Sequence, residues 1–514
     1  MVTEKIIEFI LWLLIAASII AVVTNRYKIP YTVALVLGGL AIDFFELEIM
    51  EGFHFSPEIV LIIFLPALLF EAGMNINIQQ LRRNLIPILS LAIIGVLIST
   101  FITGFAIAEL GEIAILPALT FAALITATDP VSVIAILKEL GVSKRLTVLL
   151  EGESLLNDGT AVVLFLIFKE AVISTGEVEV MAGIGRFIAM SLGGAALGLL
   201  FGYVAGRVTR YVEDARIEIT LTTILAYMSY LVAEHLHISG VIATVAAGLM
   251  VGNYGSRIGM SARTRVALWG FWEYLVFVIN SLVFLLIGLE VKIHDLVENW
   301  WMILVGIGIT LVSRGVAVYS LVPAANLMAK PISLRWRHVL LWGGLHGTVS
   351  LALALTLPQD FPFREKILAM TFGVVLFSLV VQGLTIKGLL NLLNVKPDKE
   401  DAYDRIKVSQ IAASRSLDEL QAMYDRNEIS YPIFNKIQAE LEQRVNKIKQ
   451  ELQEIYENRP ELAEEEISLT KIRIISAEKS AITRAMADGL ISYHTGEELL
   501  DKADKRLDDL GAHS

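Results

Sequence analysis

Hydrophobic runs long enough to cross a lipid bilayer recur along the first three quarters of the chain. A spanning helix needs about 20 mostly apolar residues to cross about 30 Å of hydrocarbon. We expect thirteen transmembrane helices, which lie near residues 6–24, 31–46, 56–74, 85–109, 113–137, 146–171, 184–208, 219–236, 238–252, 268–289, 299–323, 336–357 and 366–389. The pattern therefore predicts an all-α membrane domain over residues 1–396.

Basic residues in the connecting loops predict how this domain is oriented. Sixteen Lys and Arg residues follow the odd-numbered helices, whereas six lie on the other side, where acidic residues gather. Loops rich in Lys and Arg stay in the cytoplasm. The sequence therefore predicts a multi-pass protein of the plasma (cell inner) membrane, with its N-terminus outside and its C-terminus in the cytoplasm.

The pattern changes at residue 397 from membrane-spanning to water-soluble. Residues 397–514 hold 25 acidic and 17 basic side chains. Apolar positions recur there at helical spacing in four segments, residues 403–426, 433–457, 463–488 and 494–509. We predict a cytoplasmic tail of two helical hairpins, and from its position we expect it to regulate the membrane domain by binding a ligand or a protein. A solvated, poorly packed tail is the alternative.

The amino-acid composition excludes several kinds of site and activity. The 514 residues carry a net charge of −11 and include no cysteine, which excludes disulfides and thiolate metal sites. Nucleotide-binding loops are absent from the sequence, so ATP-driven pumping is not expected. We predict no cofactor, no enzymatic activity and no nucleic-acid partner; the lipid bilayer is the expected surrounding.

Of the charged residues in the predicted helices, five are candidates for a position deep in the membrane: Glu71, Asp129, Glu153, Asp158 and Arg314. A charge at that depth costs several kcal/mol, so each needs a partner or a purpose. Asp158 lies about 18 Å along its helix from residue 146, which places it near the bilayer midplane.

Hard oxygen ligands surround this position. Ser154 lies one turn before Asp158 on the same face, and Glu153 and Asn157 form a second such pair on the neighbouring face. In the segment before, Pro130 breaks the helix beside Thr128 and Asp129, which frees carbonyl groups near residues 126 and 127. Transporters place ion sites at such breaks.

Together these groups predict a site for a monovalent cation, most simply Na+. The predicted ligands are Asp158, Asp129, Ser154, Thr128 and the freed carbonyl oxygens. A bare carboxylate is costly inside the membrane, so the site would hold either a proton or a cation. That competition produces exchange. Alternatively, these acids only form hydrogen bonds between helices.

Three further residues have two interpretations each. Arg314 needs a buried partner, and elimination leaves Glu153; the pair is either architectural or takes part directly in transport. Glu71 is an outlying ligand or gate, or else an interfacial acid. His346, in a stretch with three glycines, is either a group that titrates near neutral pH or a hydrogen-bonded packing residue.

Glycines also recur at spacings of four in the predicted helix near 184–208, at Gly194, Gly198, Gly202 and Gly206. Small residues at this spacing let two helices approach closely. The contact lies within the chain or in a dimer.

Three motifs resemble those of the sodium/proton antiporters of the NhaP and animal Na+/H+ exchanger type, across residues 1 to about 392. The motifs are residues 128–130, Thr-Asp-Pro; 151–159, Glu-Gly-Glu-Ser-Leu-Leu-Asn-Asp-Gly; and 342–347, Trp-Gly-Gly-Leu-His-Gly. The resemblance implies a homodimer of thirteen-helix protomers with inverted six-helix repeats. It also implies that the broken fifth and twelfth helices cross near the ion, and that a mobile core moves against a dimerisation domain.

The resemblance also implies residue roles. Asp158 is the principal ligand of cation and proton, Asn157 stabilises the helix crossing, and Glu153 bridges to Arg314. Asn157 before Asp158 implies electroneutral one-for-one exchange. The family usually has arginine where His346 stands, so the role of that arginine is not transferred.

Other functions remain to be compared with Na+/H+ exchange. Within the same class, K+/H+ exchange is the second choice, and Li+ is a further possible substrate. Two membrane aspartates also occur in intramembrane aspartyl proteases, but the sequence around Asp158 differs from their usual Gly-x-Gly-Asp. A passive cation channel would need a continuous polar pore, which the apolar helices do not supply.

Overall fold

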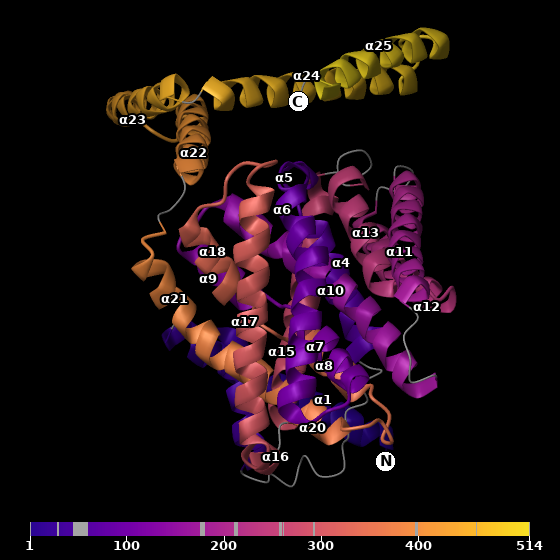
Figure 1. The fold of residues 1–514 in the computed structure, drawn as a ribbon. Coiled ribbons are helices and arrows are strands. Elements are labelled where there is room, and N and C mark those ends of the chain that lie inside the picture. Colours follow the sequence, from indigo (N-terminus) through magenta and orange to yellow (C-terminus); the bar gives the residue numbers. More distant parts are fainter. Residues whose placement is uncertain are drawn as a thin grey trace. The chain divides into compact units, whose positions relative to one another are not determined.

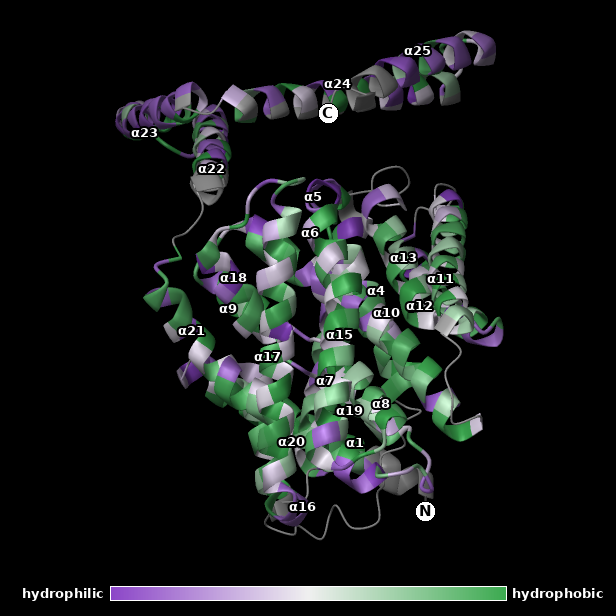
Figure 2. Ribbon diagram, viewed as in Figure 1, coloured by the Kyte–Doolittle hydropathy of each residue, from purple (hydrophilic) through white to green (hydrophobic). Residues whose placement is uncertain are grey.

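In the computed structural model, the protein forms two compact units, Met1–Pro397 and Asp398–Ser514. The structure describes residues 2–27, 30–44, 60–174, 180–209, 214–255, 260, 262–290, 293–395, 399–458 and 460–512. Within these ranges, every regular element is a helix. Hydrophobic residues dominate the first unit and hydrophilic residues dominate the second (Figure 2).

Most helices of the first unit run along one common direction (Figure 1). In chain order they are α1 Val2–Tyr27, α2 Tyr31–Phe44, α4 Leu65–Asn75, α5 Ile78–Arg83, α6 Leu85–Leu89, α7 Val96–Gly111, α8 Ile115–Ile125, α9 Val131–Glu139, α10 Lys144–Ser174, α11 Val180–Val208, α12 Ala215–His235, α13 Gly240–Met250, α15 Ala262–Glu290, α16 Ile293–Glu298, α17 Trp300–Ala325, α18 Leu334–Trp342, α19 Thr348–Leu355, α20 Arg364–Phe377 and α21 Gly383–Leu392. Four π-helical stretches adjoin them, at Val60–Phe64, Ser90–Gly95, Val251–Gly255 and Ser378–Gln382. The sequence pattern did not predict these stretches or the short helices α5 and α16.

Among the described residues, seven helical segments are long and apolar enough to cross a membrane. They are Glu8–Tyr27, Leu85–Gly111, Met181–Val208, Ala215–His235, Thr264–Glu290, Trp300–Ala325 and Arg364–Leu392. Four shorter apolar segments accompany them, at Tyr31–Ile42, Val60–Asn75, Ile115–Ile125 and Gly240–Gly255. The first unit is therefore an integral membrane domain with several crossings.

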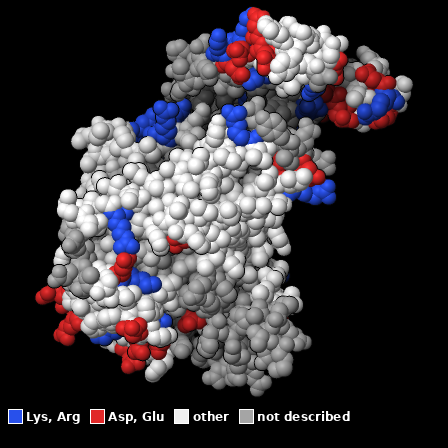
Figure 3. Space-filling model, turned by 90° about the vertical axis from the view of Figure 1, so that its right-hand side faces the viewer, with Lys and Arg blue, Asp and Glu red and all other residues white. Residues whose placement is uncertain are grey.

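The helices differ in how much of their surface is covered by protein. Every residue of α8 from Pro117 to Ile125 is buried, so α8 lies in the interior of the unit. In contrast, α1 and α11 expose large apolar side chains such as Val22 and Leu192, as a lipid-facing helix does. The face of the first unit in Figure 3 has a broad area without charged side chains among its described residues.

The glycines of α11 lie against another helix of the same chain. A Cβ atom added to Gly198 would lie 2.0 Å from the carbonyl oxygen of Ala243 in α13, and one added to Gly194 would lie 2.6 Å from that of Ser239. Only glycine permits this backbone-to-backbone distance. The glycine stripe is thus a contact within the chain.

The second unit consists of four helices, α22 Lys399–Asp425, α23 Tyr431–Asn458, α24 Pro460–Ala487 and α25 Tyr493–Ala512. Helix α22 packs against α23, and α24 packs against α25, which gives two helical hairpins. Ala413, Val445 and Ile448 form a small buried core in the first hairpin.

Candidate functional site

Two helices of the membrane unit are interrupted at the centre of their length. Residues 126–130 separate α8 from α9, and residues 343–347 separate α18 from α19. The two non-helical stretches meet, because the amide of Asp129 donates a hydrogen bond of 2.6 Å to the carbonyl oxygen of Leu345. Backbone groups that a continuous helix would satisfy internally are thus satisfied across the crossing.

The sequence explains why both helices are interrupted and why the two interrupted segments come so close to each other. Pro130 has no amide hydrogen to continue the helix. A Cβ atom on Gly344 would lie 2.1 Å from the guanidinium carbon of Arg314, and one on Gly347 would lie 2.6 Å from the Cβ of Asp129. These two glycines leave room for the charged side chains beside them.

Helix α10 holds the first break through a single residue, Thr128. The hydroxyl of Ser154 donates to the Thr128 carbonyl oxygen at 2.5 Å, and the amide of Thr128 donates to Asp158 Oδ1 at 3.2 Å. The side-chain amide of Asn157 donates to the Thr128 hydroxyl at 3.1 Å. Three side chains within five residues of α10 therefore fix the backbone and side chain of Thr128.

A cavity of about 360 Å³ opens beside this arrangement. Its lining includes all four predicted ligands, Thr128, Asp129, Ser154 and Asp158. Asp129 Oδ1 accepts a bond of 3.2 Å from the amide of Val131, and the remaining carboxylate oxygens offer hard ligands to a cation. The structure thus brings the two aspartates, which lie 29 positions apart in the sequence, to one cavity.

The carbonyl oxygen of Ala127, which we expected to be free, already has two partners. His346 Nδ1 lies 3.2 Å from it, and the hydroxyl of Ser350 donates to it at 3.3 Å. His346 is buried, and its backbone amide and carbonyl both bond to the hydroxyl of Ser378. His346 therefore links the second break to the first, which agrees with the hydrogen-bonded packing interpretation.

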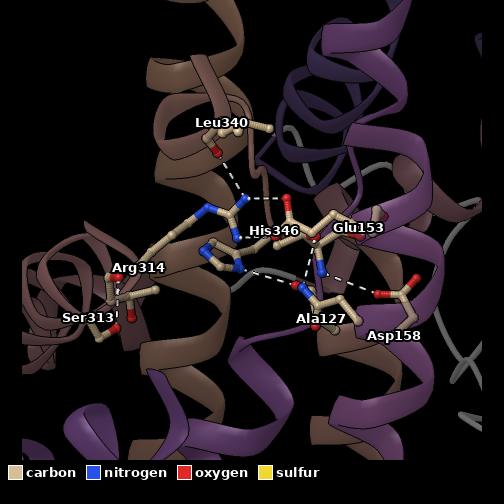
Figure 4. A network of polar contacts seen from close by, with 11 residues as sticks. Ala127, Glu153, Asp158, Ser313, Arg314, Leu340 and His346 are labelled. Atoms are coloured by element: carbon tan, nitrogen blue, oxygen red, sulfur yellow. Dashed lines mark hydrogen bonds and ion pairs between the residues drawn. The ribbon is translucent and has the colours of Figure 1, made fainter. Parts of the chain in front are cut away.

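Arg314 of α17 points toward Glu153 of α10 (Figure 4). Its guanidinium lies 3.1 Å from Glu153 Oε1 and donates to the carbonyl oxygen of Leu340 at 2.9 Å. The Arg314 and Glu153 side chains are 11% and 4% exposed. Glu153 does not line the cavity of about 360 Å³, whereas Asp158 does.

Glu71 of α4 lines the same cavity as the two aspartates. Its carboxylate accepts a hydrogen bond from the side-chain amide of Asn75, which in turn accepts a bond of 3.1 Å from the indole of Trp269. Glu71 therefore shares a cavity with the aspartates, which suits an outlying ligand or gate.

Sequence reasoning did not assign five polar residues of the cavity to the site: Asn75, Lys138, Glu151, Asn280 and Thr348. The spacing along the sequence could have indicated two of them, Lys138 and Glu151. Residues 131, 134, 135 and 138 of α9 line the cavity, as do residues 151, 154, 155 and 158 of α10. Each set follows the spacing of one helix face, so Lys138 and Glu151 lie on the faces that carry the site. Asn280 comes from α15, and no local pattern singles it out.

The interrupted helices that cross beside Asp129 and Asp158 define a class of protein, the ion-coupled secondary transporters. The family model described as "Sodium/hydrogen exchanger, transmembrane" matches residues 13–392. The chain therefore belongs to the sodium/hydrogen exchanger family, and it is an antiporter of that family rather than an enzyme.

Individual relatives agree with this assignment. The chain is 38% identical over 496 residues to the Na(+)/H(+) antiporter NhaG of Bacillus atrophaeus, with 94% of each chain covered. It is 42% identical to the antiporter ApNhaP of Aphanothece halophytica, with 77% of this chain and 76% of the other covered. The solved structure of MjNhaP1 from Methanocaldococcus jannaschii superposes with a TM-score of 0.63 at 21% identity and covers 76% of this chain and 100% of that one, which supports the fold.

Proposed function

We propose that this protein exchanges Na+ for H+ across the plasma membrane, and that Asp158 carries either ion in turn. The observation that supports this most directly is the cavity in which Asp158 and Asp129 lie beside the two interrupted helices. A carboxylate in that position is stable only when a proton or a cation neutralises it. Competition between the two ions at one group couples their movements in opposite directions.

The ligand set follows from the same geometry. Asp158 and Asp129 supply carboxylate oxygens, and Ser154 and Thr128 position the backbone between them. The Arg314–Glu153 pair and Asn157 serve as structural support, because each bonds to a partner that holds the crossing in place. Glu71 is proposed as an outlying ligand on the path to the site.

We propose one-for-one, electroneutral exchange by alternating access. Asn157 stands beside Asp158 where a further carboxylate would add a titrating charge, and Glu153 is already neutralised by Arg314. The proposed topology has thirteen crossings, with interrupted helices at the fifth and twelfth positions and inverted six-helix repeats. The helix bounds support this count, and the homodimer and the cytoplasmic C-terminus remain predictions from the resemblance and the loop charges.

The test uses everted membrane vesicles from cells without other Na+/H+ antiporters. Adding Na+ should collapse an imposed pH gradient with the wild-type protein, and Asp158→Asn should abolish the response at equal protein amount. A wild-type response from Asp158→Asn would overturn the proposed site. Titrations with Na+, Li+ and K+ decide between Na+/H+ and K+/H+ exchange, and insensitivity of the rate to membrane voltage tests electroneutrality.

The second unit is proposed as a regulatory domain in the cytoplasm. It has its own small core and its own ion pairs, so it does not depend on the membrane unit for local packing. Removal of residues 398–514 should leave exchange intact and alter its dependence on pH or on a cytoplasmic ligand. An unchanged response to both would remove the regulatory role.

A further inference from the structure

We propose that Lys138 sets the cation affinity and the charge selectivity of the site, by holding a fixed positive charge in the mouth of the cavity that contains Asp129 and Asp158. This inference rests on the proposed function, because it concerns the ion that the same cavity admits. It assigns a role to a residue that neither contacts the proposed site nor belongs to the motifs of the family resemblance.

The position of Lys138 follows from the two helices that line the cavity. Helix α9 turns one face to the cavity from Val131 to Lys138, and α10 turns one face to it from Glu151 to Asp158. Seven residues of helix rise about 10 Å, so Glu151 lies about 10 Å from Asp158 along the α10 axis. Lys138 Nζ lies 3.3 Å from Glu151 Oε1, which places the ammonium group at the same level.

This level is the solvent-facing end of the cavity. The Lys138 side chain is 66% exposed and the Glu151 side chain 23%, whereas Asp158 is buried. Among the described residues that line the cavity, Lys138 alone is a lysine or arginine, whereas Glu71, Asp129, Glu151 and Asp158 are acidic. An incoming cation therefore passes the Lys138–Glu151 pair, in which Lys138 supplies the positive charge that offsets one of the four acidic charges of the lining.

Coulomb's law gives the sign and scale of the effect. A unit charge about 10 Å from the site, in a medium of intermediate dielectric, changes the affinity for a monovalent cation by about three- to tenfold. The repulsion acts twice as strongly on a divalent cation, so the factor for Mg2+ is the square of the factor for Na+. Lys138 thus weakens Na+ binding moderately and weakens the binding of divalent cations by the square of that factor in an otherwise acidic cavity.

The proton is also a monovalent cation, so Lys138 repels it as it repels Na+. The pH of the assay therefore decides whether the effect is visible. Removing the charge of Lys138 strengthens the binding of Na+ and of H+ by the same factor. At acidic pH the two changes cancel in the KM for Na+, because protons occupy the site. At alkaline pH the site is free of protons, and the full change appears in the KM.

The experiment measures Na+-dependent exchange in everted vesicles at alkaline pH and low ionic strength. Lys138→Gln should lower the KM for Na+ by about three- to tenfold, Lys138→Glu should lower it further, and Lys138→Arg should resemble the wild type. The inhibition constant for Mg2+ should fall by the square of the Na+ factor. Raising the ionic strength with choline chloride should shrink every difference, because the Debye length falls to about 3 Å at 1 M salt.

Lys387→Gln is the matched control. Lys387 Nζ lies 3.2 Å from Glu139, the residue that follows Lys138, but Lys387 does not line the cavity. The KM of the Lys387→Gln variant for Na+ should differ less than twofold from that of the wild type. If Lys138 and Glu151 served only to join α9 to α10, Lys138→Gln would lower thermal stability without a salt-dependent change in KM.

The outcomes separate this inference from the proposed function. A wild-type protein that exchanges no Na+ for protons would overturn both. A wild type that exchanges, with an unchanged or raised KM in Lys138→Gln at low ionic strength, would overturn only the role of Lys138. Equal changes for Na+ and Mg2+ would also contradict it, since a fixed charge must act more strongly on the divalent ion.

Discussion

The guanidinium of Arg314 in α17 lies 3.1 Å from the carboxylate of Glu153 in α10, with both side chains almost fully buried. The pair ties α17 to the helix that carries Asp158 five residues later. Because Arg314 also donates to the Leu340 carbonyl oxygen near the end of α18, one side chain joins three helices around the crossing.

Breaking this pair on one side should destabilise the protein strongly. Arg314→Met leaves the Glu153 carboxylate buried without a cationic partner, a loss that costs about 3–5 kcal/mol in other proteins. The double variant Glu153→Leu/Arg314→Met removes both charges and should recover most of that stability. Thermal unfolding in detergent, followed by tryptophan fluorescence, measures both effects. A double variant that is less stable than either single variant would show that the pair stabilises the protein by more than the mutual neutralisation of its two charges.

The glycine beside Arg314 should not tolerate a side chain. Gly344→Ala places a Cβ atom 2.1 Å from the guanidinium carbon of Arg314, so the arginine must move and the pair with Glu153 must weaken. We expect a loss of about 1–3 kcal/mol in the free energy of unfolding. Gly388→Ala in α21 is the control, because nothing lies within 4 Å of its added Cβ atom and alanine favours a helix by about 1 kcal/mol. Similar melting temperatures for the two variants would contradict this account.

Ser154 should tune cation affinity without being essential. Its hydroxyl donates to the Thr128 carbonyl oxygen, and loss of one such bond costs about 1 kcal/mol, which corresponds to about fivefold in affinity. Ser154→Ala should therefore raise the KM for Na+ by about fivefold and retain exchange. Thr160→Ala serves as the control, since the Thr160 hydroxyl bonds only to the Leu156 carbonyl oxygen of its own helix. Equal KM values for the two variants would remove Ser154 from the site.

The tail contains an acid whose ionisation stabilises its packing. Burial opposes the charge of Glu466, but hydrogen bonds from Lys407, Tyr403 and Tyr456 lower its pKa from 4.5 to about 2. A carboxylate with a lowered pKa in the folded state stabilises that state above its ordinary pKa and ceases to do so as the pH falls through the lowered value. The contact between α22 and α24 should therefore weaken as the pH falls from 4.5 to about 2.

Spin labels can follow this contact in the full-length protein, because the chain has no cysteine of its own. With labels at Ala412→Cys and Thr470→Cys, the distance distribution should broaden in acid. Glu466→Gln should broaden it already at neutral pH and remove most of the dependence on acid. A distribution that stays narrow throughout in Glu466→Gln would show that other contacts hold the helices together.

The sequence by itself determined the membrane class, the hydrophilic helical tail and the position of the two helix breaks. Apolar runs are visible because a bilayer demands about 20 such residues in succession, independent of what packs around them. Pro130 and the glycines at 343, 344 and 347 mark the breaks, since they act on the backbone locally. The same local chemistry singled out Asp129 and Asp158 as buried acids that need a purpose.

Only the tertiary structure decided which groups meet. Three side chains of α10 converge on Thr128, 26 to 30 positions before them. The Ala127 carbonyl oxygen accepts from Ser350 and contacts His346, because segments more than 200 residues apart pack together. The glycines of α11 serve a contact with α13, a choice that spacing left open. Lys138 belongs to the cavity only because α9 and α10 turn the same faces to it; partners across helices are set by packing, which a local pattern does not encode.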